Sequence, residues 1–162
     1  MFIKRLSLSL IAFFILMGAL YCNYADASDK ITVFVDNKKV SFPDAQPMIV
    51  SDRVLVPARF ISENLGASVQ WNPEENKVII HHLDEMKNNL DIEMTIGNSE
   101  VNILDYRLRY TKTLDVPPMI INDRTMVPLR FISEAFNCKV SWDSAQNYVV
   151  IFSPNFNGIV GD

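Results

Sequence analysis

Imidazole and thiol side chains, the usual ligands of copper and zinc and common catalytic groups, are few in this sequence. His81 and His82 are the two histidines of the chain, and because they are neighbours at the end of an expected strand, their side chains diverge. A copper site needs a cluster of imidazoles, which such a pair does not form, so we interpret both as exposed loop residues. Cys138 has no nearby motif that supplies an activating base, and we expect it to pack as a small apolar side chain. We therefore predict no catalytic, cofactor-binding or metal-ligating residue.

Two arginines lie at the start of expected helices, where the helix dipole favours acidic side chains. Arg59 and Arg130 occupy matching positions in two similar stretches of the chain. We predict that each guanidinium binds a carboxylate and so connects its helix to the neighbouring hairpin, a structural role that we favour over ligand binding. The candidate carboxylates are Glu63, Glu134, Asp52 and Asp123.

Aromatic residues supply the remaining candidates. Trp71 and Trp142 have flat faces that suit sugar rings, but each follows an inward-facing valine by two residues, so we interpret both as core anchors. A second group combines tyrosine with arginine, which are enriched at protein interfaces, although an ordinary two-sided strand explains the same pattern. This candidate partner surface consists of Tyr106, Arg107, Arg109 and Tyr110.

A duplicated stretch indicates how these residues are positioned. Residues 47–71 and 118–142 match without a gap, 71 positions apart. A repeat of this size is typical of scaffolds built from like parts. The repeated positions that we expect to be structural are Arg53, Pro57, Arg59, Phe60, Glu63 and Trp71 in the first copy, and Arg124, Pro128, Arg130, Phe131, Glu134 and Trp142 in the second.

Each copy predicts strands, a hairpin, one short helix and two further strands. Polar residues 51–53 separate two apolar runs, which is typical of a hairpin. Pro57 suits the first helical position, Gly66 suits the left-handed position after the helix, and Asn137 replaces it in the second copy. Ser62, like its counterpart, is expected to face solvent. The predicted fold class is α+β: two homologous units, each a mostly antiparallel twisted sheet packed against one short helix.

The predicted organisation has five parts. Lys4 and Arg5 precede an apolar run, and small residues follow at 25–27, which together indicate a secretory signal peptide; an uncleaved anchor is the alternative. The stretch at 104–115 is longer than its counterpart and predicts an extended strand or ribbon. The parts are a signal peptide at 1–27, a first repeat unit at 28–82, a connector at 83–90, a second repeat unit at 91–153 and a loose tail at 154–162.

Composition limits the classes of partner. The chain has 162 residues and a formal net charge of −4, with no basic cluster. This balance argues against nucleic acid and against anionic membrane surfaces, so we expect membrane contact only through an uncleaved signal segment. The expected location is secreted and extracellular, with association to the cell wall left open.

The repeated motif resembles that of a known family. Both copies contain D-R-x-x-V-P-x-R-F-I-S-E, followed by V-x-W and a closing V-x-I strand. This wording resembles the copper amine oxidase-like N-terminal domain, also called a stalk domain, of exported proteins in Gram-positive bacteria. The resemblance implies a sheet twisted around one helix, remote from any oxidase active site, and an extracellular address. It does not imply the oxidase reaction.

These observations favour an exported, non-catalytic stalk or interaction domain protein of the cell envelope that binds an unknown protein or a cell-wall glycan. The duplication and the lack of a catalytic constellation both favour it. A carbohydrate- or peptidoglycan-binding module is one alternative, and an accessory subunit of a separate extracellular enzyme is another. A hydrolase or oxidase is disfavoured, because we see no segment that carries a catalytic domain.

Overall fold

The computed structural model describes residues 30–84 and 88–157. The predicted signal peptide lies outside the described residues, as do part of the predicted connector and the last part of the predicted tail. Among the described residues, no helix combines the length and apolarity needed to cross a membrane.

The described elements are short strands with two helices. The strands are β1 (Thr32–Val35), β2 (Lys38–Lys39), β3 (Met48–Val50), β4 (Arg53–Pro57), β5 (Ser68–Asn72), β6 (Lys77–Leu83), β7 (Asn89–Thr95), β8 (Glu100–Asp105), β9 (Leu108–Thr113), β10 (Met119–Ile121), β11 (Arg124–Pro128), β12 (Lys139–Asp143) and β13 (Tyr148–Phe152). The helices are α2 (Ala58–Asn64) and α3 (Leu129–Ala135). A mostly β structure with two short helices agrees with the predicted α+β class.

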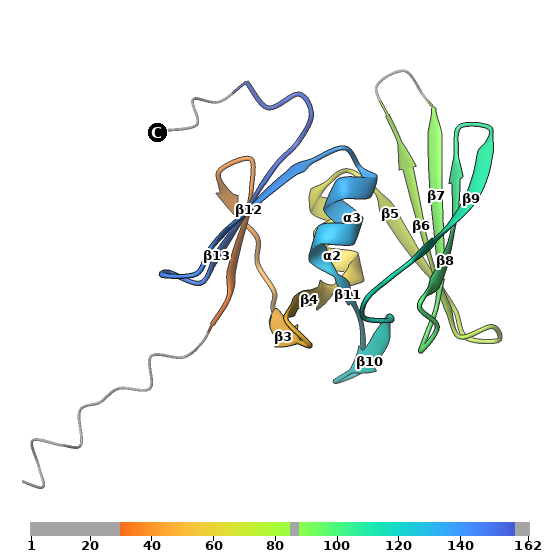
Figure 1. Ribbon diagram of the computed structural model, residues 1–162, viewed down its shortest axis with the longest axis horizontal. Helices are drawn as coiled ribbons and strands as arrows, with labels where there is room; N and C mark the ends of the chain where they lie inside the picture. The colour runs from red at the N-terminus through yellow and green to blue at the C-terminus, as the bar shows by residue number, and fades with distance from the viewer. Residues whose placement is uncertain (1–29, 85–87, 158–162) are drawn as a thin grey trace, which may run out of the picture.

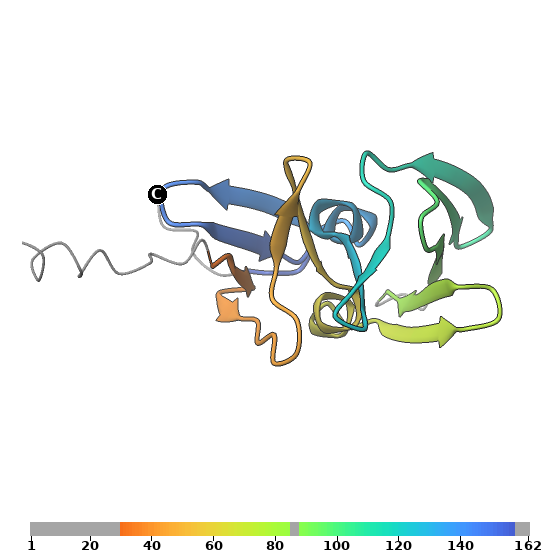
Figure 2. The ribbon, with the colours of Figure 1, turned by 90° about the horizontal axis from the view of Figure 1, so that it is seen from below.

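The strands form three sheets around the pair of helices. Their strand orders are β12-β13-β1-β2, β10-β11-β4-β3 and β5-β6-β7-β8-β9. Figure 1 shows the two helices between the first and the third of these sheets, with the second, central sheet at one end of them. The view from below in Figure 2 shows the same order, with the helices seen end-on. Each sheet contains strands from both predicted units, so neither range has a sheet of its own.

The central sheet joins the two halves of the chain through β4 and β11. These strands pair antiparallel, with Val56 opposite Val127. The two valines are equivalent positions of the repeat, 71 residues apart. The flanking partners are Pro128 with Leu55 and Met126 with Pro57. These two pairs are also equivalent, because each residue of one pair lies 71 positions from a residue of the other. The pairing is therefore symmetric about the two valines.

Tight turns join each outer strand of the central sheet, β3 or β10, to its inner neighbour, β4 or β11, as predicted. Both central turn residues have positive φ: 47° and 59° at Ser51 and Asp52, and 50° and 57° at Asn122 and Asp123. Positive φ at both positions defines the turn whose twist matches a hairpin, and Asn and Asp tolerate it better than most residues.

The helix ends confirm the predicted caps and correct the predicted starts. Gly66 has φ +83° and Asn137 has φ +57°. In the first copy, the Gly66 N–H donates to Glu63 O at 3.1 Å and the next N–H donates to Ser62 O at 2.9 Å, which is the Schellman pattern. The prolines were predicted one residue too far into the helices. Pro57 has ψ 121° and precedes α2, so it ends β4 and does not occupy the first helical position.

Two serines predicted to face solvent are buried instead. Ser62 and Ser133 are both 0% exposed. The two helices lie between flanking sheets, so each helix is covered on more of its circumference than the single apolar stripe indicated. The Ser133 hydroxyl donates to Leu129 O at 3.0 Å, which satisfies its buried polar group.

One main core connects all three sheets. It contains Val56 and Val127 of the central sheet together with Ile61 and Ile132 of the helices, all 0% exposed. A smaller cluster covers the opposite face of the central sheet and is made of Ala45, Leu55, Val116 and Met126. The central sheet is therefore buried on both faces. Each fully buried valine or isoleucine stabilises the fold by about 1.5–3 kcal/mol relative to an exposed one.

The two ends of the described chain meet in the first sheet. Strand β1 pairs parallel with β13, with Val33 opposite Val149. Beyond this pair, the Ser153 N–H and hydroxyl donate to the Asp36 carboxylate at 2.8 and 2.7 Å. The predicted connector is shorter than expected, because β6 extends to Leu83 and β7 begins at Asn89.

We predict that Gly66→Ala lowers the free energy of unfolding by about 1 kcal/mol, the cost of a Cβ in the left-handed region. The space itself is open, since the nearest atom to an added Cβ is 4.0 Å away on His82. Urea denaturation measures the change. Asn137→Gly is the matched control and is expected to be neutral or stabilising, because its φ of +57° already favours glycine. An unchanged stability for Gly66→Ala would contradict this assignment.

Candidate functional site

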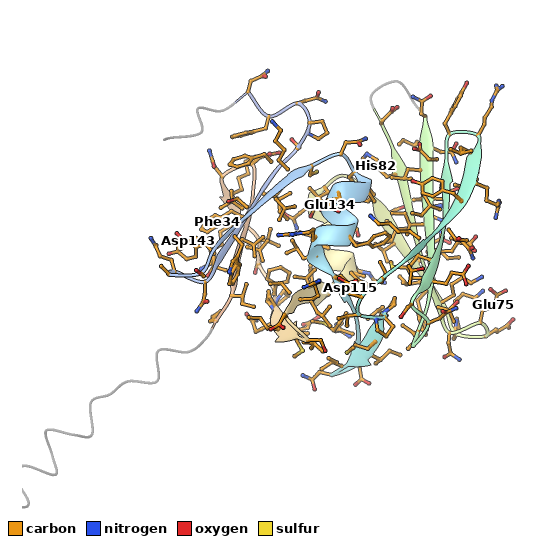
Figure 3. The ribbon with its side chains drawn as sticks, in the orientation of Figure 1. Phe34, Glu75, His82, Asp115, Glu134 and Asp143 are labelled. Carbon is orange, nitrogen blue, oxygen red and sulfur yellow. The ribbon has the colours of Figure 1, made fainter. Side chains whose placement is uncertain are left out.

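The two histidines lie on a strand, which corrects the prediction that they are exposed loop residues. His81 and His82 are consecutive residues of β6 and both are half-buried. Their side chains diverge, as expected: the His81 Nδ1 lies 2.8 Å from the Asp91 Oδ1, whereas the His82 ring stacks on Phe136 with 4.6 Å between the ring centroids. Figure 3 shows His82 between the third sheet and α3.

No group of three or more histidine, cysteine, aspartate or glutamate side chains that could hold a metal ion occurs within the described ranges. His82 has a buried Nδ1 for which the structure gives no hydrogen-bond partner. Its packing against Phe136, the C-cap residue of α3, explains why it is half-buried: the end of the helix lies against the face of β6 that carries it.

Cys138 is buried next to the end of α3, as predicted for a packing residue. Burial, aided by the negative charge of Asp36, raises the pKa of the thiol to about 11. Its Sγ lies 3.6 Å from the Phe136 carbonyl oxygen. With this raised pKa the thiol stays protonated at neutral pH. It is therefore unreactive, because the thiolate is the nucleophilic form.

The arginines predicted to connect helix and hairpin do not do so. Arg59 Nε lies 3.9 Å from Glu63 Oε1 within the same helix, and both side chains are exposed. The corresponding glutamate of α3, Glu134, lies 3.9 Å from Lys112 of β9 instead. An exposed pair at this distance contributes little to stability, because water and salt screen it.

A different pair of arginines makes the long-range connections. Arg53 donates from Nε and Nη2 to Asp115 Oδ2 at 2.9 and 2.6 Å. Arg124 donates from the same two atoms to Asp44 Oδ2 at 3.2 and 2.7 Å. Each ion pair joins one half of the chain to the other. The two pairs are equivalent, because Arg124 lies 71 positions after Arg53 and Asp115 lies 71 positions after Asp44. Figure 3 labels Asp115 at the central sheet.

The two aspartates were missed in the sequence. Asp44 and Asp115 precede the repeated stretch, in segments that otherwise differ. The signal that could have found them is the spacing itself, since both lie three residues before the repeated Pro-Met-Ile.

The two tryptophans are less buried than predicted. Trp71 is 38% exposed, which corrects its interpretation as a core anchor. Trp142 is half-buried and packs against the edge of the main core. Each lies on an edge strand of its sheet, β5 or β12, which has a hydrogen-bonded neighbour on one side only. The valines predicted to face inward, Val69 and Val140, are partly buried against the main core, whereas the valines opposite the tryptophans, Val78 and Val149, are fully buried.

The predicted partner surface is exposed in the structure. A turn at Tyr106 and Arg107 divides the predicted ribbon into the end of β8 and the edge strand β9. Every residue of β9 is exposed. Tyr106, Leu108 and Tyr110 are 55%, 66% and 41% exposed. We call β9 with its preceding turn, residues 106–113, the arm.

The arm leaves one edge of its backbone unpaired. Leu114 N–H donates to Ser99 O at 2.8 Å, and hydrogen-bonded residues alternate along an antiparallel pair. With the register of β8 and β9, Lys112, Tyr110 and Leu108 therefore bond to β8. The N–H and C=O groups of the residues between them face away from the sheet. These outward residues are Arg109, Thr111 and Thr113.

Comparison with known proteins gives one family. The family model described as copper amine oxidase N-terminal domain matches residues 34–151. The searches of curated proteins and of solved structures found no match.

We predict that Arg53 and Asp115 couple by about 0.5 kcal/mol, the range of exposed ion pairs with good geometry. The double-mutant cycle uses Arg53→Met, Asp115→Asn and the combination, measured by urea denaturation. The coupling should fall in 1 M salt, where the screening length is about 3 Å. Arg130→Leu is the control and should leave stability nearly unchanged; a larger loss for Arg130→Leu than for Arg53→Met would contradict the assignment.

Proposed function

Because this chain belongs to the copper amine oxidase N-terminal domain family, we propose that it is a non-catalytic interaction domain presented in the cell envelope by a Gram-positive bacterium. The N-terminal domain of copper amine oxidases is itself a non-catalytic domain. The observation that supports binding is the arm, an exposed edge strand with tyrosine, leucine and basic side chains.

We propose that the protein is exported. Support comes from the sequence of the first residues, in which Lys4 and Arg5 precede an apolar run and small residues follow at 25–27. Cell fractionation tests it: the protein should occur in the medium or the wall fraction with an N-terminus near Ser28. Full-length protein confined to the cytoplasm would contradict export.

We also infer that residues 28–82 and 91–153 are homologous units that exchange strands. The support is the symmetric β4·β11 pairing, the two matching turns and the two crosswise arginine–aspartate bonds. In this arrangement neither unit completes its core alone, because the main core draws on both ranges.

The binding surface that we propose is the open edge of β9. An edge strand offers unpaired backbone groups to an added strand. The arm carries Arg107, Arg109 and Lys112, whereas the whole chain has a net charge of −4. A second copy of the chain would bring like charges together at this edge, so the charge favours an extended acidic segment of another exported protein.

We predict that Thr111→Pro abolishes binding of an extended peptide of alternating glutamate and valine. The Thr111 N–H faces outward, so proline removes a donor from the edge without removing a bond to β8. Wild type should bind this peptide more tightly than the matching lysine–valine peptide by about tenfold or more. Fluorescence anisotropy of labelled peptides measures both.

Charge-reversal variants provide a second, independent test of the same surface. Arg109→Glu should weaken the acidic peptide and leave thermal stability unchanged, because this side chain is exposed. Lys38→Glu, at an exposed residue of β2, is the matched control and should change nothing. Equal binding of both peptides by wild type, or full binding by Thr111→Pro, would contradict the proposed surface.

A further inference from the structure

Two grooves on the surface are built from equivalent residues. The first has a volume of about 390 Å³ and lies between α2, β5 and the β10–β11 hairpin. The second has a volume of about 320 Å³ and lies between α3, β12 and the β3–β4 hairpin. Every residue that lines the second groove is 71 positions from one that lines the first. Each groove combines the helix of one half with the hairpin of the other.

The first groove combines an exposed indole with polar groups. It is lined by Trp71 and Ile120, which are 38% and 49% exposed, together with Arg59 and Asp123. The one carboxylate that the structure gives Arg59, Glu63, is 3.9 Å away and exposed to solvent. The guanidinium therefore retains donors that a ligand can use.

The second groove repeats these groups. It is lined by Trp142, Ile49, Arg130 and Asp52, and Ile49 is 55% exposed. Within the described residues, the structure gives Arg130 no ion pair, since Glu134 of the same helix lies beside Lys112 instead. Its guanidinium therefore has at least as many hydrogen-bond donors open to a ligand as that of Arg59.

The chemistry of each groove matches a pyranose ring. Such a ring has an apolar C–H face, which packs on an indole, and hydroxyls at its edge that both donate and accept hydrogen bonds. An arginine and an aspartate on the rim supply both kinds of partner. An acidic ligand would meet the carboxylate of Asp52 or Asp123, and a purely apolar ligand would leave these polar groups unpaired.

We propose that the two grooves are equivalent binding sites for a neutral glycan, with one strand bound in each. This inference concerns a surface different from the arm and does not depend on it. The first groove lies at the β10–β11 hairpin and the second at the β3–β4 hairpin, so they lie at opposite edges of the central sheet. Each groove is therefore a separate site, and one molecule has two.

Intrinsic fluorescence is a direct probe of both grooves, because Trp71 and Trp142 are the two tryptophans of the chain. The probes are hexasaccharides of β-1,4-linked N-acetylglucosamine and of β-1,4-linked glucose. At least one should shift the tryptophan emission of the full chain to shorter wavelength, and calorimetry should give two equivalents per molecule. No binding of either probe, or a single equivalent, would overturn the proposal.

Variants assign the sites. Trp71→Ala and Trp142→Ala should each leave one equivalent, and the double variant should lose binding by about tenfold or more at both grooves. Arg59→Gln and Arg130→Gln give the same reading without touching an aromatic ring, in case a tryptophan variant does not fold. Tyr106→Ala, an exposed aromatic residue of the arm, is the control and should retain both equivalents.

Binding that survives in the double tryptophan variant, or that is lost in Tyr106→Ala, would overturn the assignment to the grooves. The arm variants separate this result from the previous proposal. Thr111→Pro removes the outward backbone donor of β9 and should leave both glycan equivalents in place.

Discussion

The antiparallel pairing of β4 with β11 is the contact on which the rest of the structure depends. Val56 faces Val127 at its centre, and both valines are fully buried in the main core. Each strand leads directly through a proline into its helix. Because extended backbone changes to helix at Pro57 and Pro128, the position and direction of both helices follow from the register of this one pair. A slip by one residue would turn every buried side chain of these strands to the wrong face.

The same pairing explains why the polar connections run crosswise. Once the two hairpins lie side by side, the arginine at the base of one reaches the aspartate that precedes the other. Each bond is exposed and contributes modestly to stability, so the main stabilisation comes from the buried apolar residues on both faces of the central sheet. The arginines therefore orient the segments that enter the central sheet more than they hold the fold together. The grooves are a by-product of the same exchange, since each needs a helix and a hairpin from different halves.

Local features could be predicted from the sequence, and long-range coverage could not. Gly66 and Asn137 were assigned correctly because the left-handed position after a helix depends on backbone preferences of single residues. Trp71 and His82 were assigned incorrectly for a common reason. Alternation along a strand tells which residues share a face but not whether another element covers that face. Phe136, the C-cap residue of α3, covers His82, whereas Trp71 lies on an edge strand of its sheet. Asp115 lies 62 positions from its arginine, and only the repeat spacing connects the two in the sequence.

The parallel joint between β1 and β13 determines how the fold responds to mechanical load. In a parallel pair the chain enters one strand and leaves the other at opposite ends. A force that pulls residue 30 away from residue 157 therefore slides these strands along each other and strains all of their backbone bonds together, instead of opening them one at a time. The carboxylate of Asp36, which holds Ser153, adds a further bond at the end of this joint. A domain built this way resists stretching between its ends far better than an antiparallel hairpin pulled from its open end.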